Sequence, residues 1–137
     1  MAHEHIVYMM LADSAAQLRD REALAAYAPK LEDLAQRDDH RPYLAVAHRA
    51  WGIAHHLDGN LDEAETSLKN ALSLFEKLGT TWQAGRTHND LGELALARAD
   101  QQAARDHLTR ALEAFESLSA KPDIERTRLA LEVAANN

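Results

Sequence analysis

Apolar residues recur at intervals of three and four over two long stretches of the chain. In the first stretch they are Leu61, Ala64, Leu68, Ala71, Leu72, Phe75 and Leu78. In the second they are Ala104, Leu108, Ala111, Leu112, Phe115 and Leu118. This spacing places side chains on one face of an α-helix, whereas a half-buried strand would alternate at every second residue. Both stretches are therefore predicted to be amphipathic helices, and no segment has the alternation of a strand.

The same pattern recurs at a fixed offset of forty residues, so that residues 48–91 superpose on residues 88–131. The pairs that coincide include Gly52 and Gly92, Ala64 and Ala104, Leu68 and Leu108, and Phe75 and Phe115. Self-similarity at such a period is typical of stacked helical repeats. Two repeats are therefore expected in this part of the chain.

Weaker copies of the pattern lie on either side. Near the start, Ala23 aligns with Ala64 and Tyr27 with Leu68 at an offset of 41, which predicts that one residue has been lost before Ala23. Near the end, residues 126–131 copy 86–91 and the pattern then stops. Half a repeat at the end of an array is typical of a terminal cap.

Glycine, proline and capping residues divide the chain into seven helical segments. Gly59 and Gly79 suit helix C-termini, Asp100 suits an N-cap, and Thr80 with Gln83 forms a capping-box pattern. The predicted helices are residues 4–18, 20–36, 42–57, 61–78, 81–98, 101–117 and 122–134. Because the connections are short, successive helices are expected to pack antiparallel.

Bulky and small residues recur at a spacing that resembles the tetratricopeptide repeat. The segments that carry the resemblance are His48-x2-Trp51-Gly52-x2-His55 with Ala64-x3-Leu68, and His88-x2-Leu91-Gly92-x2-Ala95 with Ala104-x3-Leu108. A weaker copy is Tyr8-x2-Leu11-Ala12-x2-Ala15 with Ala23-x3-Tyr27. The period of forty exceeds the usual thirty-four, and the proline that commonly ends the motif is missing. Such long variants resemble the repeats of large bacterial signalling regulators and cyclases.

The resemblance implies an all-α, right-handed superhelix formed by a single domain over residues 1–137. About three helical hairpins are expected, with a capping helix after them. Their approximate ranges are 4–36, 42–78 and 81–118, and the capping helix spans 122–134. Small residues such as Gly52 and Ala64 are expected where helices cross closely.

In this family the first helix of each pair lines a concave groove that accepts peptides. The matching positions here are Met9, Asp13, Arg49, Ile53, His56, Arg86, Asn89, Asp90 and Glu93. Four of them, Arg86, Asn89, Asp90 and Glu93, form a polar stripe of mixed charge, which favours a peptide carrying both a basic and an acidic residue. The alternative is that the stripe is merely the solvated face of an amphipathic helix.

Composition and charge narrow the classes of partner. The chain of 137 residues is 46% hydrophobic and has a formal net charge of −7, so nucleic-acid binding is not expected. It has no cysteine, which fits a cytoplasmic protein and excludes disulfides and thiolate sites. The apolar run at residues 6–12 is too short to span a membrane and predicts a first helix that is buried or covered by a partner.

Metal, cofactor and catalytic sites are not expected. His48 and His55 are seven residues apart, too far for the adjacent-turn zinc pair, and Asp62 lies in a first helical turn where an acid favourably meets the helix dipole. His48 and His88 are expected to fill the bulky interface position with one ring nitrogen hydrogen-bonded. Trp82 is predicted to belong to the core.

These observations predict a non-enzymatic scaffold that binds a protein or peptide partner in a concave groove. Two alternatives remain open. One is self-association, as a homodimer, through the first helix, where Met9 and Met10 have no preceding repeat to cover them. The other is an effector-sensing module within a larger signalling or transcription regulator.

Overall fold

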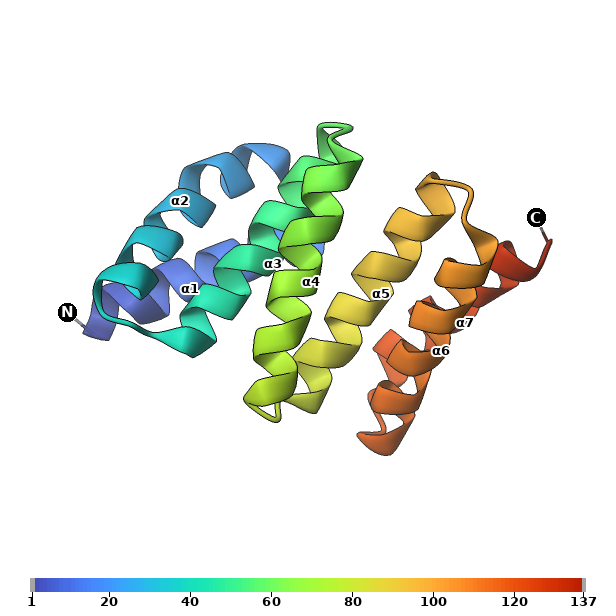
Figure 1. The fold of residues 1–137 in the computed structure, drawn as a ribbon. Helices are drawn as coiled ribbons and strands as arrows, with labels where there is room; N and C mark the ends of the chain where they lie inside the picture. Colours follow the sequence, from blue (N-terminus) through green and yellow to red (C-terminus); the bar gives the residue numbers. More distant parts are fainter. Residues whose placement is uncertain (1, 137) are drawn as a thin grey trace. The chain divides into compact units, whose positions relative to one another are not determined.

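The structure is a computed structural model that describes residues 2–136, with side chains from residue 6 onward. Seven α-helices account for most of these residues (Figure 1). The helices are α1 (Ala2–Leu18), α2 (Arg21–Arg37), α3 (Arg41–Leu57), α4 (Leu61–Lys77), α5 (Thr81–Ala97), α6 (Gln101–Ser117) and α7 (Lys121–Asn136). Each begins and ends within two residues of its predicted span. No strand occurs in this described range, and the all-α helical-repeat class is confirmed.

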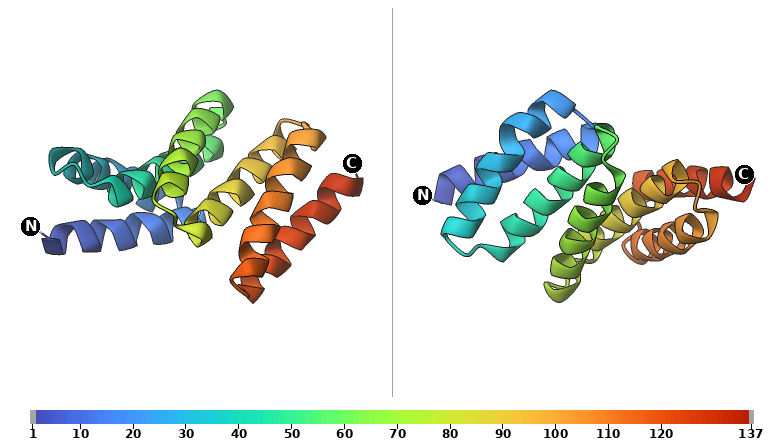
Figure 2. Two further views of the ribbon diagram at one scale, coloured as in Figure 1. Left: turned by 60° about the horizontal axis from the view of Figure 1, so that its bottom comes forward. Right: turned by 45° about the horizontal axis from the view of Figure 1, so that its top comes forward.

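The chain divides into two compact units, residues 1–74 and residues 75–137. In the first unit, α1, α2 and α3 pack against one another (Figure 2). The second unit begins in the last turn of α4, and its helix α6 packs against both α5 and α7 (Figure 1). Residues of α5 also touch α7 directly. The contacts and cavities described below each lie within one unit.

The connections between helices repeat one backbone motif at intervals of twenty residues. A residue with positive φ occurs at each connection, and these residues are Arg19, Asp39, Gly59, Gly79, Ala99 and Ser119. The next residue donates its N–H to the carbonyl five positions earlier, as in Asp20 to Ala15 at 2.9 Å and Asp100 to Ala95 at 2.9 Å. This is the Schellman arrangement, which satisfies the last carbonyls of a helix. The predicted role of the two glycines is confirmed, but four connections use a side-chain-bearing residue instead.

Most of the described N-caps use a side chain. Asp20, His40 and Asp100 each accept a hydrogen bond from the backbone N–H three residues on, at distances of 3.1 to 3.3 Å. The cap predicted at Asp100 is therefore confirmed. The capping box predicted at Thr80 is wrong, because its hydroxyl donates to the Phe75 carbonyl at 3.1 Å and makes no cap bond to α5.

The even-numbered helices bury equivalent positions at an offset of forty residues. The buried sets are Leu24, Ala28, Leu31 and Ala35 in α2, Ala64, Leu68, Ala71 and Phe75 in α4, and Ala104, Leu108, Ala111 and Phe115 in α6. The predicted offset of 41 for the first repeat is therefore wrong, and no residue has been lost. Alignment by residue type was misleading because α2 has Leu24 and Leu31 where α4 and α6 have alanine. Conversely, α2 has Ala28 where the later helices have leucine.

Two glycines allow the two helices of a hairpin to pack closely, α3 against α4 and α5 against α6. A Cβ added to Gly52 would lie 2.5 Å from the Leu68 Cγ, and one added to Gly92 would lie 2.6 Å from the Leu108 Cγ. At the equivalent position in α1 the residue is Ala12, and the position equivalent to the two leucines is Ala28. The first repeat therefore combines alanine with alanine where the later repeats combine glycine with leucine.

Candidate functional site

The residues assigned to the groove lie on the odd-numbered helices, and most are less accessible than expected. Met9 and Asp13 lie on α1, Arg49, Ile53 and His56 on α3, and Arg86, Asn89, Asp90 and Glu93 on α5. Met9, Asp13, His56 and Glu93 are half-buried. Arg86, Asn89 and Asp90 are only 3%, 4% and 3% exposed, and Arg49 and Ile53 are also buried. The alternative that the stripe on α5 is a solvated face is therefore wrong.

Arg49 joins α3 to α1 within the first unit. Its Nη2 donates to the Gln17 side-chain oxygen at 3.0 Å, and its Nη1 lies 3.7 Å from the Asp13 carboxylate. The guanidinium is almost completely buried, whereas about a quarter (23%) of the Asp13 side chain is exposed. A buried cation requires such partners because desolvation is costly. Arg49 therefore acts first as a structural link between two helices.

A chain of polar contacts joins α5 to α7 in the second unit. The Thr127 hydroxyl donates to Asn89 Oδ1 at 3.0 Å, and Asn89 Nδ2 donates to Glu93 Oε1 at 3.2 Å. Arg126 Nη2 donates to the same Glu93 oxygen at 3.2 Å. Thr127 is fully buried at one end, whereas Glu93 and Arg126 reach solvent at the other. We call these four residues the α5–α7 polar chain.

Trp82 is more exposed than predicted and organises the start of α5. Trp82 is 43% exposed, so the prediction that it belongs to the core is wrong. The indole Nε1 donates to the Asp123 carboxylate on α7 at 3.0 Å, and the Arg86 guanidinium lies 4.3 Å from the ring centroid. Arg86 also donates to the Gln83 side chain at 3.0 Å. Arg86 is thus held by its own helix.

His88 and His107 face each other between α5 and α6. Their Nδ1 atoms are 3.1 Å apart, so one ring donates a hydrogen bond to the other, and the predicted ring contact of His88 is confirmed. Burial, together with the charges of His107 and Arg110, lowers the pKa of His88 to about 4. His88 is therefore neutral near pH 7. No sequence pattern indicated this pair, because the two residues are 19 positions apart on different helices.

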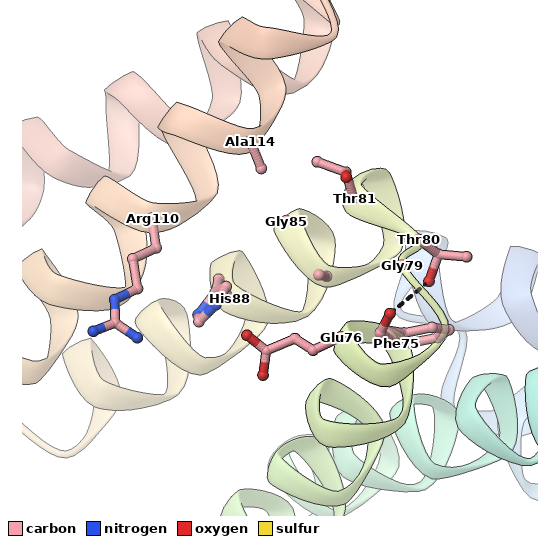
Figure 3. Close-up of a pocket in the computed structure, with 10 residues that line it drawn as sticks. Phe75, Glu76, Gly79, Thr80, Thr81, Gly85, His88, Arg110 and Ala114 are labelled. Carbon is pink, nitrogen blue, oxygen red and sulfur yellow. Dashed lines mark hydrogen bonds between the residues drawn. The ribbon is translucent and has the colours of Figure 1, made fainter.

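A cavity of about 360 Å³ lies beside His88 in the second unit. Its lining comes from the last turn of α4, the turn that follows, the first half of α5 and one side of α6 (Figure 3). Small residues Ala84, Gly85 and Ala114 form part of the wall, and Glu76 and Arg110 carry its charges. Sequence reasoning missed this cavity, since none of its lining residues was among those assigned to the groove.

A second hollow, of about 340 Å³, lies in the first unit where α3 ends and α4 begins. It is lined by His55, Asp62, Glu63, Thr66 and Ser67. Its two acids occupy the first turn of α4, where they favourably meet the helix dipole, as predicted for Asp62. Among the described residues, no group of three or more His, Asp or Glu side chains could hold a metal ion.

Comparison with known proteins identifies the family. The tetratricopeptide repeat matches residues 43–117, which is more than half of the 137-residue chain. A search of curated proteins gave no match. No helix in the described range is long and apolar enough to cross a membrane. The matched segment runs from α3 to the end of α6 and includes both glycines that contact leucines. The chain therefore belongs to the tetratricopeptide repeat family, whose repeats are generally protein–protein interaction modules.

Proposed function

We propose that this protein is a non-catalytic scaffold that binds a peptide or protein partner through α5 and α7 of the second unit, with the accessible end of the α5–α7 polar chain as its main anchor. The observation that carries the proposal is the fixed pair of opposite charges formed by Glu93 and Arg126. Family membership supplies the general role of protein binding. The pair supplies a place on this chain where a partner could be recognised.

Glu93 is held by Asn89 and Arg126, Arg126 is held by Glu93, and both side chains are open to solvent. Their side chains are 27% and 38% exposed, and Glu93 Oε1 accepts hydrogen bonds from both Asn89 and Arg126. Anchors that are already held in position lose less conformational entropy when a partner binds. A partner with one basic and one acidic residue would match both charges, as the mixed stripe on α5 first indicated.

The buried members of the expected groove take a different role in this proposal. Asn89 and Arg86 hold their neighbours in place, because Asn89 fixes Glu93 and Arg86 packs over Trp82. In the first unit, Arg49 similarly holds Asp13. Substitution of such residues would disturb the fold as well as binding, so a clean test must use the accessible residues.

The test compares two charge-pair variants in affinity purification from the source organism. The variant Glu93→Ala with Arg126→Ala removes the proposed anchor. The control, Glu116→Ala with Arg128→Ala, removes another exposed pair at 3.3 Å in the same unit. Partners that are retained by the wild type and the control should be lost from the anchor variant, with unchanged circular dichroism. An identical set of partners for all three proteins would contradict the proposal.

A second function, self-association, is favoured by the surface of α1. The exposed apolar residues on this helix are Ile6, Val7, Met10 and Leu11, at 45%, 51%, 61% and 37% exposure. At the equivalent positions in α3, Val46, Ala47 and Ala50 are buried. The apolar face of α1 formed by these residues therefore corresponds to a face of α3 that is buried. A second copy could cover it without burying a charge, since these four side chains are apolar.

Sedimentation equilibrium tests this second function. The wild type should form dimers whose dissociation constant rises at least tenfold when Val7 and Met10 are both changed to Glu. The control is Leu129→Glu, which introduces a charge at an exposed leucine of α7. A wild type that is monomeric at every concentration would dismiss self-association and leave the scaffold proposal intact.

A further inference from the structure

At three of its wall positions the cavity beside His88 has smaller residues than the first unit, although Phe75 stands where the first unit has Ala35. At the offset of forty residues that relates the helices, the residues equivalent to Ala84, Gly85 and Ala114 are Leu44, Ala45 and Leu74. All three wall residues of the second unit are therefore smaller. A Cβ added to Gly85 would lie 3.0 Å from Ala114 Cβ. Helices α5 and α6 therefore approach closely at this wall, where both have small side chains.

The two charged residues of the cavity occupy positions that are uncharged in the first unit, whereas the first unit has Asp39 and Arg41 where the cavity has Gly79 and Thr81. Glu76 and Arg110 stand where the first unit has the neutral amides Gln36 and Asn70. Within the described part of the chain, neither the Glu76 carboxylate nor the Arg110 guanidinium takes part in an ion pair or a side-chain hydrogen bond. Two charges of opposite sign are thus placed around one cavity without neutralising each other by contact.

The arrangement of the two charges is visible in Figure 3. Glu76 extends from the last turn of α4, Arg110 extends from α6, and His88 lies between them on α5. Because the pKa of His88 is lowered to about 4, its imidazole adds no positive charge near pH 7. The cavity therefore offers one anionic group, one cationic group and an apolar wall. Its volume of about 360 Å³ is near the lower end of the range for small-molecule sites, roughly 300–1,000 Å³.

We propose that this cavity binds a small zwitterionic amino acid with an aliphatic side chain. Glu76 would accept hydrogen bonds from the ammonium group, and Arg110 would donate to the carboxylate. The side chain would lie against Ala84, Gly85 and Ala114, where the first unit has Leu44, Ala45 and Leu74. This site uses none of the residues proposed to anchor a protein partner, so its test is independent of that function.

The proposal would give the chain an effector site in the second unit, between the last turn of α4, α5 and α6. A bound amino acid would touch α4, α5 and α6 together, because the lining residues come from all three helices. A ligand that binds only the folded state stabilises it by mass action. Occupancy should therefore raise the melting temperature in proportion to the logarithm of ligand concentration once the site is saturated.

The first arm of the experiment titrates the full chain with four related compounds and follows amide resonances of Gly85 and His88 by NMR. The compounds are L-leucine, N-acetyl-L-leucine, L-leucinamide and N-acetyl-L-leucinamide, which carry both charges, the carboxylate only, the ammonium only and neither. L-Leucine should bind most tightly, and removal of either charge should weaken binding about two- to fivefold, as expected for a partly exposed ion pair. Equal binding of all four compounds would contradict the proposed roles of Glu76 and Arg110.

The second arm transfers first-unit residues into the second unit. Ala84→Leu with Ala114→Leu should fill the cavity and abolish leucine binding. Glu76→Gln and Arg110→Asn should each reduce the advantage of leucine over the analogue that lacks the matching charge. These two exposed substitutions keep the proposal testable if the leucine variant does not fold. Unchanged leucine affinity in the charge variants, or no resonance change at the solubility limit of leucine, would overturn the proposal.

Discussion

Gly92 lies so close to Leu108 that a Cβ at position 92 would be 2.6 Å from the leucine Cγ. Gly52 and Leu68 have the same relationship at 2.5 Å, whereas the first repeat has Ala12 and Ala28 at the equivalent positions. The volume lost on one helix therefore accompanies the volume gained on the other. Because the core is close-packed, the combined side-chain volume of the two residues matters more than the volume of either one.

This relationship predicts strong coupling between positions 92 and 108. Gly92→Ala should destabilise the protein by about 1–3 kcal/mol because the added methyl overpacks the crossing. Leu108→Ala should cost about 2–5 kcal/mol through the cavity it leaves. The double variant copies the alanine pair of the first repeat and should be more stable than the sum of the two single changes predicts. Urea unfolding of all four proteins gives the coupling energy.

The second prediction concerns the turns with positive φ. Ala99 adopts φ of 59°, where an L-residue with a side chain is strained, and Gly59 occupies the equivalent place two helices earlier at φ of 80°. Ala99→Gly should stabilise the protein by about 0.5–1 kcal/mol, and Gly59→Ala should destabilise it by about 1 kcal/mol. Differential scanning calorimetry checks both. Shifts of the same sign in the two variants would contradict this account of the turns.

The third prediction follows from the lowered pKa of His88. Between about pH 6.5 and about pH 4 the unfolded chain binds a proton at this histidine that the folded chain does not. The free energy of unfolding should therefore fall as the pH is lowered through this range. His48, whose pKa is also lowered by burial, acts in the same direction.

Substitution separates the contribution of His88 from other titrations. His88→Gln retains hydrogen-bonding groups but cannot titrate, so it should flatten the fall in stability between pH 6.5 and 4. Thr66→Val, at an exposed position of α4 whose side chain does not titrate, serves as the control and should leave the slope unchanged. Urea titrations at several pH values give the comparison. Equal slopes for the wild type and His88→Gln would show that the lowered pKa of His88 does not control the acid response.

The fourth prediction concerns the buried end of the α5–α7 polar chain. Thr127→Val removes the donor to Asn89 Oδ1 in a fully buried position and should cost about 1–3 kcal/mol. Thr66→Val is the matched control, because its hydroxyl bonds to the Asp62 carbonyl on an exposed surface. The control should change stability by less than about 0.5 kcal/mol. Similar losses of unfolding free energy in both variants would mean that the effect of Thr127→Val does not come from the burial of its hydrogen bond.

The helices could be predicted from the sequence because their periodicity and turn residues agree. Gly59 and Gly79 marked two connections correctly. The other connections use Arg19, Asp39, Ala99 or Ser119 in the same conformation, and these residue types give no such signal. The shift assigned to the first repeat failed for a related reason, because equivalent positions keep their burial while exchanging leucine for alanine.

The candidate site was harder to predict because accessibility depends on packing between helices. Arg86, Asn89 and Asp90 have polar side chains at helical spacing, which is equally compatible with a solvated face and with a buried contact. Their burial follows from neighbours distant in sequence, such as Thr127 for Asn89. The cavity beside His88 was also out of reach, since it arises from three small residues on two helices.

The recurrence of one turn every twenty residues bears on how such a chain can grow. Each helix ends with the same hydrogen-bonded geometry and passes the backbone to the next helix in the same way. A gene segment that encodes a forty-residue hairpin could therefore be duplicated or deleted by unequal recombination without creating an unfamiliar junction. Lengthening would demand new compatibility only between the facing side chains of adjacent hairpins.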